Sequence, residues 1–187
     1  MQRRNFLTGI ASLPLALWGA HRVLAAAGKA STPADITALQ NGWKTLLAAN
    51  ADVAPSAAPL NLSNDEWKKR LTPEAYHVLR EEGTERPGSS PLDHEKRPGV
   101  FVCAGCGLPL FTSAMKFDSG TGWPSFFTTI PGAFGEKSDY ALILKRTEYH
   151  CARCGGHHGH VFDDGPAPTN LRYCNNGVAL RFIPKTA

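Results

Sequence analysis

The second half of the chain alternates short apolar runs with glycines and prolines. The β-like runs lie at residues 100–102, 140–144, 160–162 and 178–183. Short apolar runs with turn residues at close intervals are typical of strands joined by tight connections. The pattern predicts a mainly β domain over 63–187, and it shows no long amphipathic helix after Gly83.

The segment before this β region carries three helix signals. Ser63 with Glu66 forms a capping-box pattern, and Thr72-Pro73 places an N-cap residue before a proline at the first helical position. We expect two short helices there, the second ending at Gly83. A further short helix is expected at about 35–49, inside an Ala/Pro-rich segment (28–62) that we interpret as a tether or a loose wrapping segment.

The N-terminus has the pattern of an export signal. Arg3 and Arg4 precede an apolar run at 6–20, and 25–27 is an Ala-Ala-Ala cleavage site. This predicts a twin-arginine signal peptide over 1–27 and a periplasmic protein. The alternative is an uncleaved membrane anchor, which the shortness of the run disfavours, so no stable membrane insertion is expected after cleavage.

The net charge of the chain argues against one class of partner, nucleic acids. The chain has 20 basic and 16 acidic side chains, a formal net charge of +4. Removal of 1–27 takes three arginines and leaves 160 residues with a net charge of +1. A charge so near zero argues against broad nucleic-acid binding, which needs a basic face. We expect one catalytic domain, acting as a monomer.

Four of the five cysteines form two C-x-x-C pairs, Cys103/Cys106 and Cys151/Cys154. Two such pairs can close a tetrahedral zinc site, and four thiolates leave no open position for a substrate. The spacing therefore predicts one structural zinc ion per chain. Two local disulfides in an oxidising compartment, or one redox-active dithiol, are the alternatives.

The fifth cysteine, Cys174, lies in the sequence Arg-Tyr-Cys-Asn-Asn. In an extended strand Arg172, Cys174 and Asn176 share one face. A guanidinium close to a thiol favours the thiolate, which is the reactive form. A buried, inert cysteine is the alternative.

Two further motifs carry candidate chemistry. His157, His158 and His160 fall within four positions and can be ligands of a second metal, general acids or plain loop residues. Asp163 and Asp164 can orient such a histidine or simply lie in the turn before Gly165. Trp123, between a glycine and a proline, is expected at a surface pocket, whereas the phenylalanines that follow it are expected in the core.

Together these motifs resemble the B-type methionine sulfoxide reductases. The matching pieces are the two C-x-x-C pairs, Gly122 to Phe126, Gly159 to Phe162, Asp164 to Pro166, Arg172 to Cys174 and Leu180 to Phe182. The resemblance covers about 64–184. It implies two antiparallel sheets with the zinc remote from the chemistry, and reduction of the R epimer of methionine sulfoxide in proteins or peptides.

The resemblance also implies roles for single residues. Cys174 would attack the sulfoxide sulfur and become a sulfenic acid, while His160 would help to protonate the sulfoxide oxygen. Asn176 would lie in the site, and Arg172 and Asp164 would tune and orient these groups.

On the substrate side, the resemblance implies that Trp123 packs against the methyl group of the substrate. His157 would also lie in the site, and Phe182 would help to line the pocket.

The chain departs from part of this family at Thr121, where many members carry a resolving cysteine, and at Asp163, where proline is frequent. With four thiols on zinc, no second thiol remains to form a recycling disulfide. We therefore expect an outside thiol or a thioredoxin-like partner to reduce the sulfenic acid. A zinc-knuckle binding module without activity and a peroxide-scavenging thiol enzyme are the rival interpretations.

Overall fold

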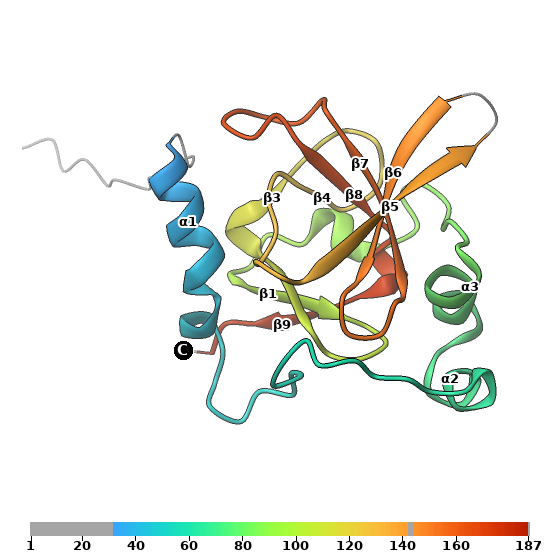
Figure 1. The fold of residues 1–187 in the computed structure, drawn as a ribbon. Coiled ribbons are helices and arrows are strands. Elements are labelled where there is room, and N and C mark those ends of the chain that lie inside the picture. Colours follow the sequence, from blue (N-terminus) through green and yellow to red (C-terminus); the bar gives the residue numbers. More distant parts are fainter. Residues whose placement is uncertain (1–31, 142–143, 187) are drawn as a thin grey trace, which may run out of the picture.

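Two antiparallel sheets form the body of the protein in this computed structural model, which describes residues 32–141 and 144–186 (Figure 1). The predicted signal peptide at 1–27 lies outside the described residues. The mainly β fold class with two antiparallel sheets is confirmed.

The smaller sheet has the strand order β2-β1-β9. It consists of β1 (Gly99–Cys103), β2 (Pro109–Thr112) and β9 (Leu180–Pro184), so the last strand of the domain pairs with the first. All residues of β1 and β2 are buried, which explains why these two strands are continuous apolar runs rather than alternating ones.

The larger sheet has the strand order β3-β4-β8-β7-β6-β5. Its strands are β3 (Lys116–Phe117), β4 (Ser125–Phe126), β5 (Phe134–Ala141), β6 (Leu144–Cys151), β7 (His157–Phe162) and β8 (Arg172–Asn175). Because β8 lies between β4 and β7, the segment that carries the fifth cysteine is held on both edges.

Aromatic side chains fill the space between the sheets. Phe111 stacks on Phe126 with ring centroids 3.9 Å apart, and Phe101 meets Phe126 edge-on at 5.1 Å. All three rings are fully buried. Burial of side chains of this size supplies about 2–3 kcal/mol each, so this cluster is a main source of stability.

Two predicted helices form where their caps indicate. Ser63 accepts a hydrogen bond from the Glu66 amide and caps α2 (Asn64–Arg70), and Thr72 caps α3 (Pro73–Glu81) in the same way. The prediction that Gly83 ends the second helix was wrong by one residue. The left-handed cap is Glu82, at φ 57°, and the exposed His77 ring lies so close to Gly83 that a Cβ there would require the ring to move.

The helix expected at 35–49 is shorter than predicted. It consists of α1 (Pro33–Asn41), followed by a 3₁₀ turn, η1 (Gly42–Leu46). In Figure 1 α1 lies on the opposite side of the sheets from α2 and α3. No helix among the described residues is long and apolar enough to span a bilayer.

Other strand predictions were also inexact. The run at 140–144 was predicted as one strand, but β5 ends and β6 begins within it. These two strands are largely polar, so hydropathy gave no sign of them. The run at 178–183 begins in a 3₁₀ turn, η4 (Gly177–Ala179), and only then becomes β9. Two further 3₁₀ turns are present: η2 (Pro91–His94) lies before β1, and η3 (Ser113–Met115) precedes β3.

Candidate active site and metal centre

The four cysteines of the C-x-x-C pairs come together in a single buried cluster. Cys103 ends β1 and Cys106 lies on the turn that follows, while Cys151 ends β6 and Cys154 lies on the turn after it. Their sulfur atoms all lie within 4.8 Å of one another. This cluster is able to hold a metal ion. It is the group found when the described residues are searched for three or more cysteine, histidine or acidic side chains close enough to share one ion.

The sulfur spacing fits a tetrahedral ion. The Sγ atoms of Cys103 and Cys154 are 3.7 Å apart, and those of Cys106 and Cys151 are 3.5 Å apart. Four thiolates at about 2.3 Å from a zinc ion would be about 3.8 Å from one another. Both close contacts join one pair to the other, whereas local disulfides would join sulfurs within a pair.

The two turns share one backbone geometry. Gly107 donates its amide to the Cys103 carbonyl, and Gly155 donates to the Cys151 carbonyl, both at 2.8 Å. Both glycines have positive φ, 72° and 67°, a region that costs a side-chain-bearing residue free energy. The glycine after each C-x-x-C pair therefore shapes the turn that presents the sulfur atoms.

The cluster needs a cation. Hydrogen bonds with Cys106 and the other two sulfurs, together with burial, raise the pKa of Cys103 well above its usual value. Four thiolates this close together repel one another unless a positive charge lies among them. A divalent ion that takes sulfur ligands fits these residues.

The N-terminal segment crosses both turns. The Ala54 amide donates to the Gly107 carbonyl at 2.8 Å, and the Leu60 amide donates to the Arg153 carbonyl at 2.7 Å. The Arg153 guanidinium in turn donates to the carbonyls of Ser56 and Ala58. Residues 52–60, which we call the strap, thus join the two halves of the cysteine cluster from outside.

The fifth cysteine occupies a different place. Cys174 lies in β8, opposite Ser125 of β4 and His160 of β7, and its side chain is only partly buried. It lines a cavity of about 170 Å³. The other lining residues are Thr84, Trp123, Arg146, Gly159, His160, Phe162, Asn175 and Asn176. None of the four clustered cysteines lines this cavity.

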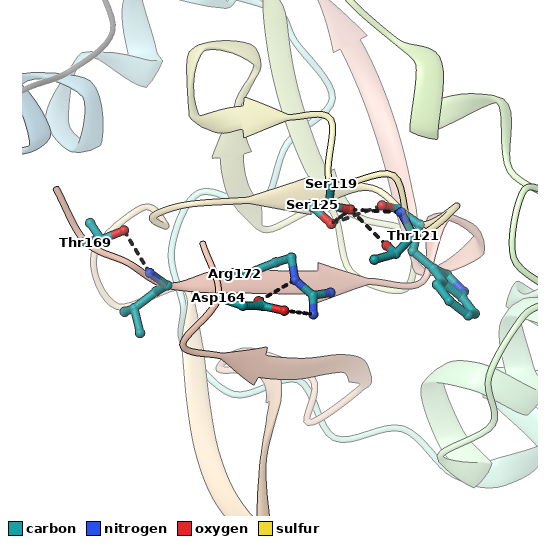
Figure 2. Close-up of polar contacts among 8 residues, drawn as sticks. Ser119, Thr121, Ser125, Asp164, Thr169 and Arg172 are labelled. Atoms are coloured by element: carbon teal, nitrogen blue, oxygen red, sulfur yellow. Dashed lines mark hydrogen bonds and ion pairs between the residues drawn. The ribbon is translucent and has the colours of Figure 1, made fainter. Parts of the chain in front are cut away.

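The charge beside Cys174 is held in place by an ion pair. Arg172 donates two hydrogen bonds to Asp164, both 2.7 Å long, which Figure 2 shows as a two-pronged contact. The hydrogen bonds from Arg172 lower the pKa of the Asp164 carboxyl, and the guanidinium also stacks 4.3 Å from the Phe162 ring. Such a bidentate pair fixes the guanidinium in one orientation.

Burial, however, has the larger effect on Cys174. It raises the pKa of the thiol above its usual value, although the charge of Arg172 and hydrogen bonds from Thr121 and Arg172 act to lower it. The sequence left the choice between a thiolate favoured by this guanidinium and a buried, inert cysteine, and the structure shows both effects at this residue. Each contact that favours the thiolate therefore matters for the reactivity of this sulfur.

The three histidines of β7, His157, His158 and His160, lie in different environments. His158 is fully buried, with its Nδ1 3.2 Å from the side-chain oxygen of Asn175, and burial lowers its pKa to about 4. His157 is also buried, and its Nδ1 lies 3.0 Å from a Glu148 carboxylate oxygen, outside hydrogen-bond geometry. Only His160 lines the cavity. The structure does not gather these histidines into a second metal site.

A glycine allows the close approach of His160 and Cys174. A Cβ at Gly159 would lie 1.9 Å from the Cys174 carbonyl oxygen, and Gly159 has φ 155°. Any side chain at this position would push β7 away from β8.

Trp123 is fixed at the cavity by the loop before β1. Its indole nitrogen donates to the Glu85 carbonyl at 3.2 Å. The Glu85 carboxylate accepts hydrogen bonds from the amides of Gly177 and Val178 at the start of η4, and burial raises its pKa. One residue therefore holds both the tryptophan and the turn that follows β8.

Asn175 and Asn176 have mainly architectural contacts. The Asn175 side-chain oxygen accepts from the Tyr149 hydroxyl at 2.9 Å. The Asn176 side chain donates to the His158 carbonyl and accepts from the Glu85 amide. Both asparagines line the cavity, and both side chains are occupied in holding its walls.

The structure does not bring every predicted site residue to the cavity. Phe182 lies on β9 of the smaller sheet, 4.8 Å from the Phe101 ring, and it is not a lining residue. Phe162 lies on the cavity instead, and Arg146 does so too. Alternation along β7 puts Phe162 on the same face as His160, a signal that sequence reasoning did not use.

The arrangement defines a class of protein: a β domain with a buried four-cysteine cluster that is able to hold a metal ion, and a separate site around a fifth thiol. Family comparison is more specific. Residues 71–184 match the model described as the SelR domain. The chain therefore belongs to this family, that of the B-type methionine sulfoxide reductases.

Curated relatives agree with this assignment. The chain is 56% identical over 121 residues to the peptide methionine sulfoxide reductase MsrB of Methanosarcina barkeri, a match that covers 64% of this chain and 85% of the relative. It is 52% identical over 126 residues to that of Agrobacterium fabrum, with 67% and 93% covered. For the protein of this name from Leptospira interrogans the identity is 48% over 124 residues, with 66% and 95% covered.

Proposed function

We propose that this protein reduces the R epimer of methionine sulfoxide, in proteins or peptides, to methionine, and so repairs oxidised proteins. The observation that carries the proposal is the position of Cys174 on one small cavity with Trp123 and His160. The volume of about 170 Å³ is smaller than the roughly 300 Å³ of a pocket for a larger ligand, and suits a single side chain.

The first step is an attack of the Cys174 sulfur on the sulfoxide sulfur. A sulfoxide oxygen becomes a better leaving group on protonation, and His160 faces Cys174 across the cavity to supply that proton. The new sulfur–sulfur bond displaces the protonated oxygen as water, and a water molecule then attacks the Cys174 sulfur and breaks that bond. Methionine leaves with two more electrons than the sulfoxide had, while Cys174 loses two electrons and carries the oxygen of the attacking water as a sulfenic acid. No outside electron donor is needed in this half of the cycle.

The side chains around the cavity bind and orient the substrate. The indole of Trp123 and the ring of Phe162 offer apolar surface for the sulfoxide methyl group. His157 lies behind His160, with ring centroids 5.5 Å apart, and positions it. Arg172, held by Asp164, stabilises the Cys174 thiolate, and Asn176 fixes the turn beside it.

The second half of the cycle needs an outside thiol. Thr121 stands where many relatives carry a resolving cysteine. One thiol displaces the oxygen of the sulfenic acid as water and forms a mixed disulfide with Cys174. A second thiol then releases Cys174 and leaves a disulfide between the two reductant sulfurs. A thioredoxin-like protein is the reductant that we propose, acting on a monomeric enzyme.

The four clustered cysteines are proposed to hold one zinc ion with a structural role. Four sulfur ligands complete its tetrahedron, so the ion supplies cross-linking between the two turns and no chemistry at the substrate. We also propose that the protein works in the periplasm after twin-arginine export, on the basis of the N-terminal pattern in 1–27. Recovery of a mature chain that begins after residue 27 from a periplasmic extract would test this.

The test of activity compares the two epimers. Purified protein is incubated with each epimer of a methionine sulfoxide peptide and dithiothreitol, and the methionine formed is measured. We expect turnover of the R epimer only, and none by Cys174→Ser. Equal turnover of both epimers would contradict the epimer assignment, and full activity of Cys174→Ser would contradict the catalytic role of this cysteine.

Two controls separate the rival functions. A binding module would reduce neither epimer. A peroxide-scavenging enzyme would consume hydrogen peroxide faster than the sulfoxide under the same conditions. Preference for the sulfoxide by the wild-type protein therefore supports the reductase over both.

A further inference from the structure

A row of side chains runs across four strands of the larger sheet. The register pairs Cys174 of β8 with His160 of β7. His160 in turn pairs with Glu148 of β6, and Glu148 pairs with Lys137 of β5. Directly paired residues of antiparallel strands carry their side chains on the same face, with Cβ atoms about 5 Å apart. Glu148 is therefore the next side chain to His160, on the side away from the reactive sulfur.

Glu148 is a buried carboxylate that the proposed reaction does not use. Its side chain is 4% exposed, with one oxygen 3.1 Å from the Lys137 ammonium and the other 3.0 Å from the Nδ1 of His157. Apolar side chains of similar volume often stabilise a fold as much as a buried ion pair does, because burial of the two charges is costly. Stability alone therefore gives no reason for a carboxylate at this position.

A β-bulge brings the His157 ring into this row. Strict alternation along β7 would put His158, rather than His157, on the same face as His160. Instead, the pairing with β6 passes from Gly159 directly to His157, with a shift of register. The His157 ring packs edge-on against that of His160, with centroids 5.5 Å apart. The bulge thus lets one imidazole contact both the buried carboxylate and the other imidazole.

The contact between Glu148 and His157 acts through charge. It lies outside hydrogen-bond geometry, so a fixed donor and acceptor do not define it. Lys137 neutralises Glu148 only in part, because this lysine is 46% exposed and also binds Glu82 at 2.5 Å. A carboxylate away from water attracts a neighbouring imidazole most strongly when the ring carries a proton.

The proposed proton donation makes use of this charge. His160 must carry a proton when it meets the sulfoxide oxygen, and Arg146, which lines the same cavity, opposes a cationic ring there. We propose that Glu148 is a positioning residue: it holds the His157 ring against His160 and supplies the negative charge that keeps this pair ready to donate. Glu148 is not among the lining residues of the cavity, so its effect passes to the substrate through the histidines. The inference rests on the proposed function, in which His160 is the acid.

One measurement isolates the half of the cycle in which the proton is donated. Purified protein is mixed with the R epimer of a methionine sulfoxide peptide without reductant, and the methionine formed in the single turnover is followed by rapid quenching. The limiting rate and the sulfoxide concentration that gives half of it are obtained separately. We expect Glu148→Gln to lower the limiting rate about tenfold and to change the half-saturating concentration less than about twofold, because donation is impaired and the pocket is intact.

Two carboxylate variants serve as controls. Glu148→Asp keeps the charge and is expected to lose less than about threefold in limiting rate. Glu136→Gln makes the same chemical change as Glu148→Gln at an exposed position of β5, on the other face of the sheet, and should match wild type. A wild-type limiting rate for Glu148→Gln would overturn the proposal, as would a Glu148→Asp rate no higher than that of Glu148→Gln.

His157→Phe tests the route of the effect. It keeps a ring beside His160 and removes the nitrogen that faces Glu148. Because the two residues act together, the double variant of Glu148→Gln and His157→Phe should lose less than the product of the two single losses. Losses that multiply would overturn the proposal. If Glu148→Gln does not fold, a wild-type limiting rate for His157→Phe would overturn it as well.

Failure of the proposed function gives a different result. A wild-type protein that forms no methionine from either epimer contradicts the reductase activity, and the role of Glu148 with it. Methionine formation by wild type together with an unaffected Glu148→Gln contradicts the role of Glu148 alone.

Discussion

Cys174 and His160 are direct partners across β8 and β7, and both side chains line one cavity. The pairing depends on Gly159, because a Cβ there would lie 1.9 Å from the Cys174 carbonyl oxygen. The two side chains that we propose as nucleophile and proton donor are thus placed by the register of a sheet rather than by flexible loops. This rigidity favours a reproducible geometry for proton transfer.

The first prediction concerns that proton. His160→Gln keeps polar bulk in the cavity but cannot act as an acid near neutral pH, so kcat/KM for the sulfoxide should fall about 100-fold. Steady-state methionine formation measures this loss. His77→Gln changes an exposed histidine on α3 and should leave the rate unchanged. A His160→Gln variant with the wild-type kcat/KM would show that His160 is not the proton donor.

The second prediction restores a resolving thiol. Thr121 is linked through Ser119 to Ser125, which is the strand partner of Cys174, so we expect Thr121→Cys to bring a second sulfur close to Cys174. One turnover without reductant should then give an intramolecular disulfide, seen as loss of two thiols in a titration under denaturing conditions. The wild-type protein should instead hold a sulfenic acid that reacts with dimedone. A disulfide to Cys174 in wild type would contradict the outside-thiol mechanism.

A third prediction follows from His158. Burial lowers its pKa to about 4 from an ordinary value of 6.5, so the folded protein holds the neutral ring while the unfolded chain takes up a proton below pH 6.5. The stability that comes from excluding this proton is fully present above pH 6.5. It is lost as pH falls toward 4, to a total of roughly 3 kcal/mol.

Urea denaturation at pH 7 and pH 5 measures this loss of stability. His158→Phe keeps a ring beside Phe134 and should show a smaller difference between the two pH values than wild type. The change in the free energy of unfolding between pH 7 and pH 5 is the quantity to compare, because the variant also loses a hydrogen bond and will be less stable at both pH values. If wild type and His158→Phe lose the same amount of unfolding free energy between pH 7 and pH 5, another group is responsible for the loss of stability at low pH.

The fourth prediction tests the cysteine cluster. Cys151→Ser removes one of four sulfur ligands and should abolish the bound zinc together with the cooperative thermal transition, because ion binding and folding are coupled. Metal analysis and calorimetry check this. Cys174→Ser, the matched control, should keep one zinc per chain. A stable Cys151→Ser protein without metal would show that the ion is not structural.

The fifth prediction concerns the strap. Arg153→Met removes two hydrogen bonds to the Ser56 and Ala58 carbonyls while keeping an apolar stem, and should cost about 1 kcal/mol. Zinc should pass to a chelator several times faster than from wild type, measured by a colorimetric reporter. Arg70→Met, near the same surface, should release zinc at the wild-type rate. Unchanged release from Arg153→Met would mean that the strap does not protect the cluster.

Local chemistry explains what could be predicted from sequence. The Ser63 and Thr72 caps form because each supplies a hydroxyl to an amide three residues away, and the two cysteine turns form around their own glycines. The β5–β6 hairpin was poorly predicted because its strands are polar and owe their form to pairing with each other and with β7.

By itself, the sequence determined the fold class, the grouping of four cysteines into one cluster and the identity of the one remaining thiol, because spacing and motif depend on neighbours in the chain. Only the tertiary structure decided which side chains meet at the cavity. It placed Phe162 there and Phe182 in the other sheet, joined Ser119 and Ser125 to Thr121, and laid the strap across the metal turns. These contacts depend on sheet register and on burial, which bring together residues far apart in the chain and which local patterns do not encode.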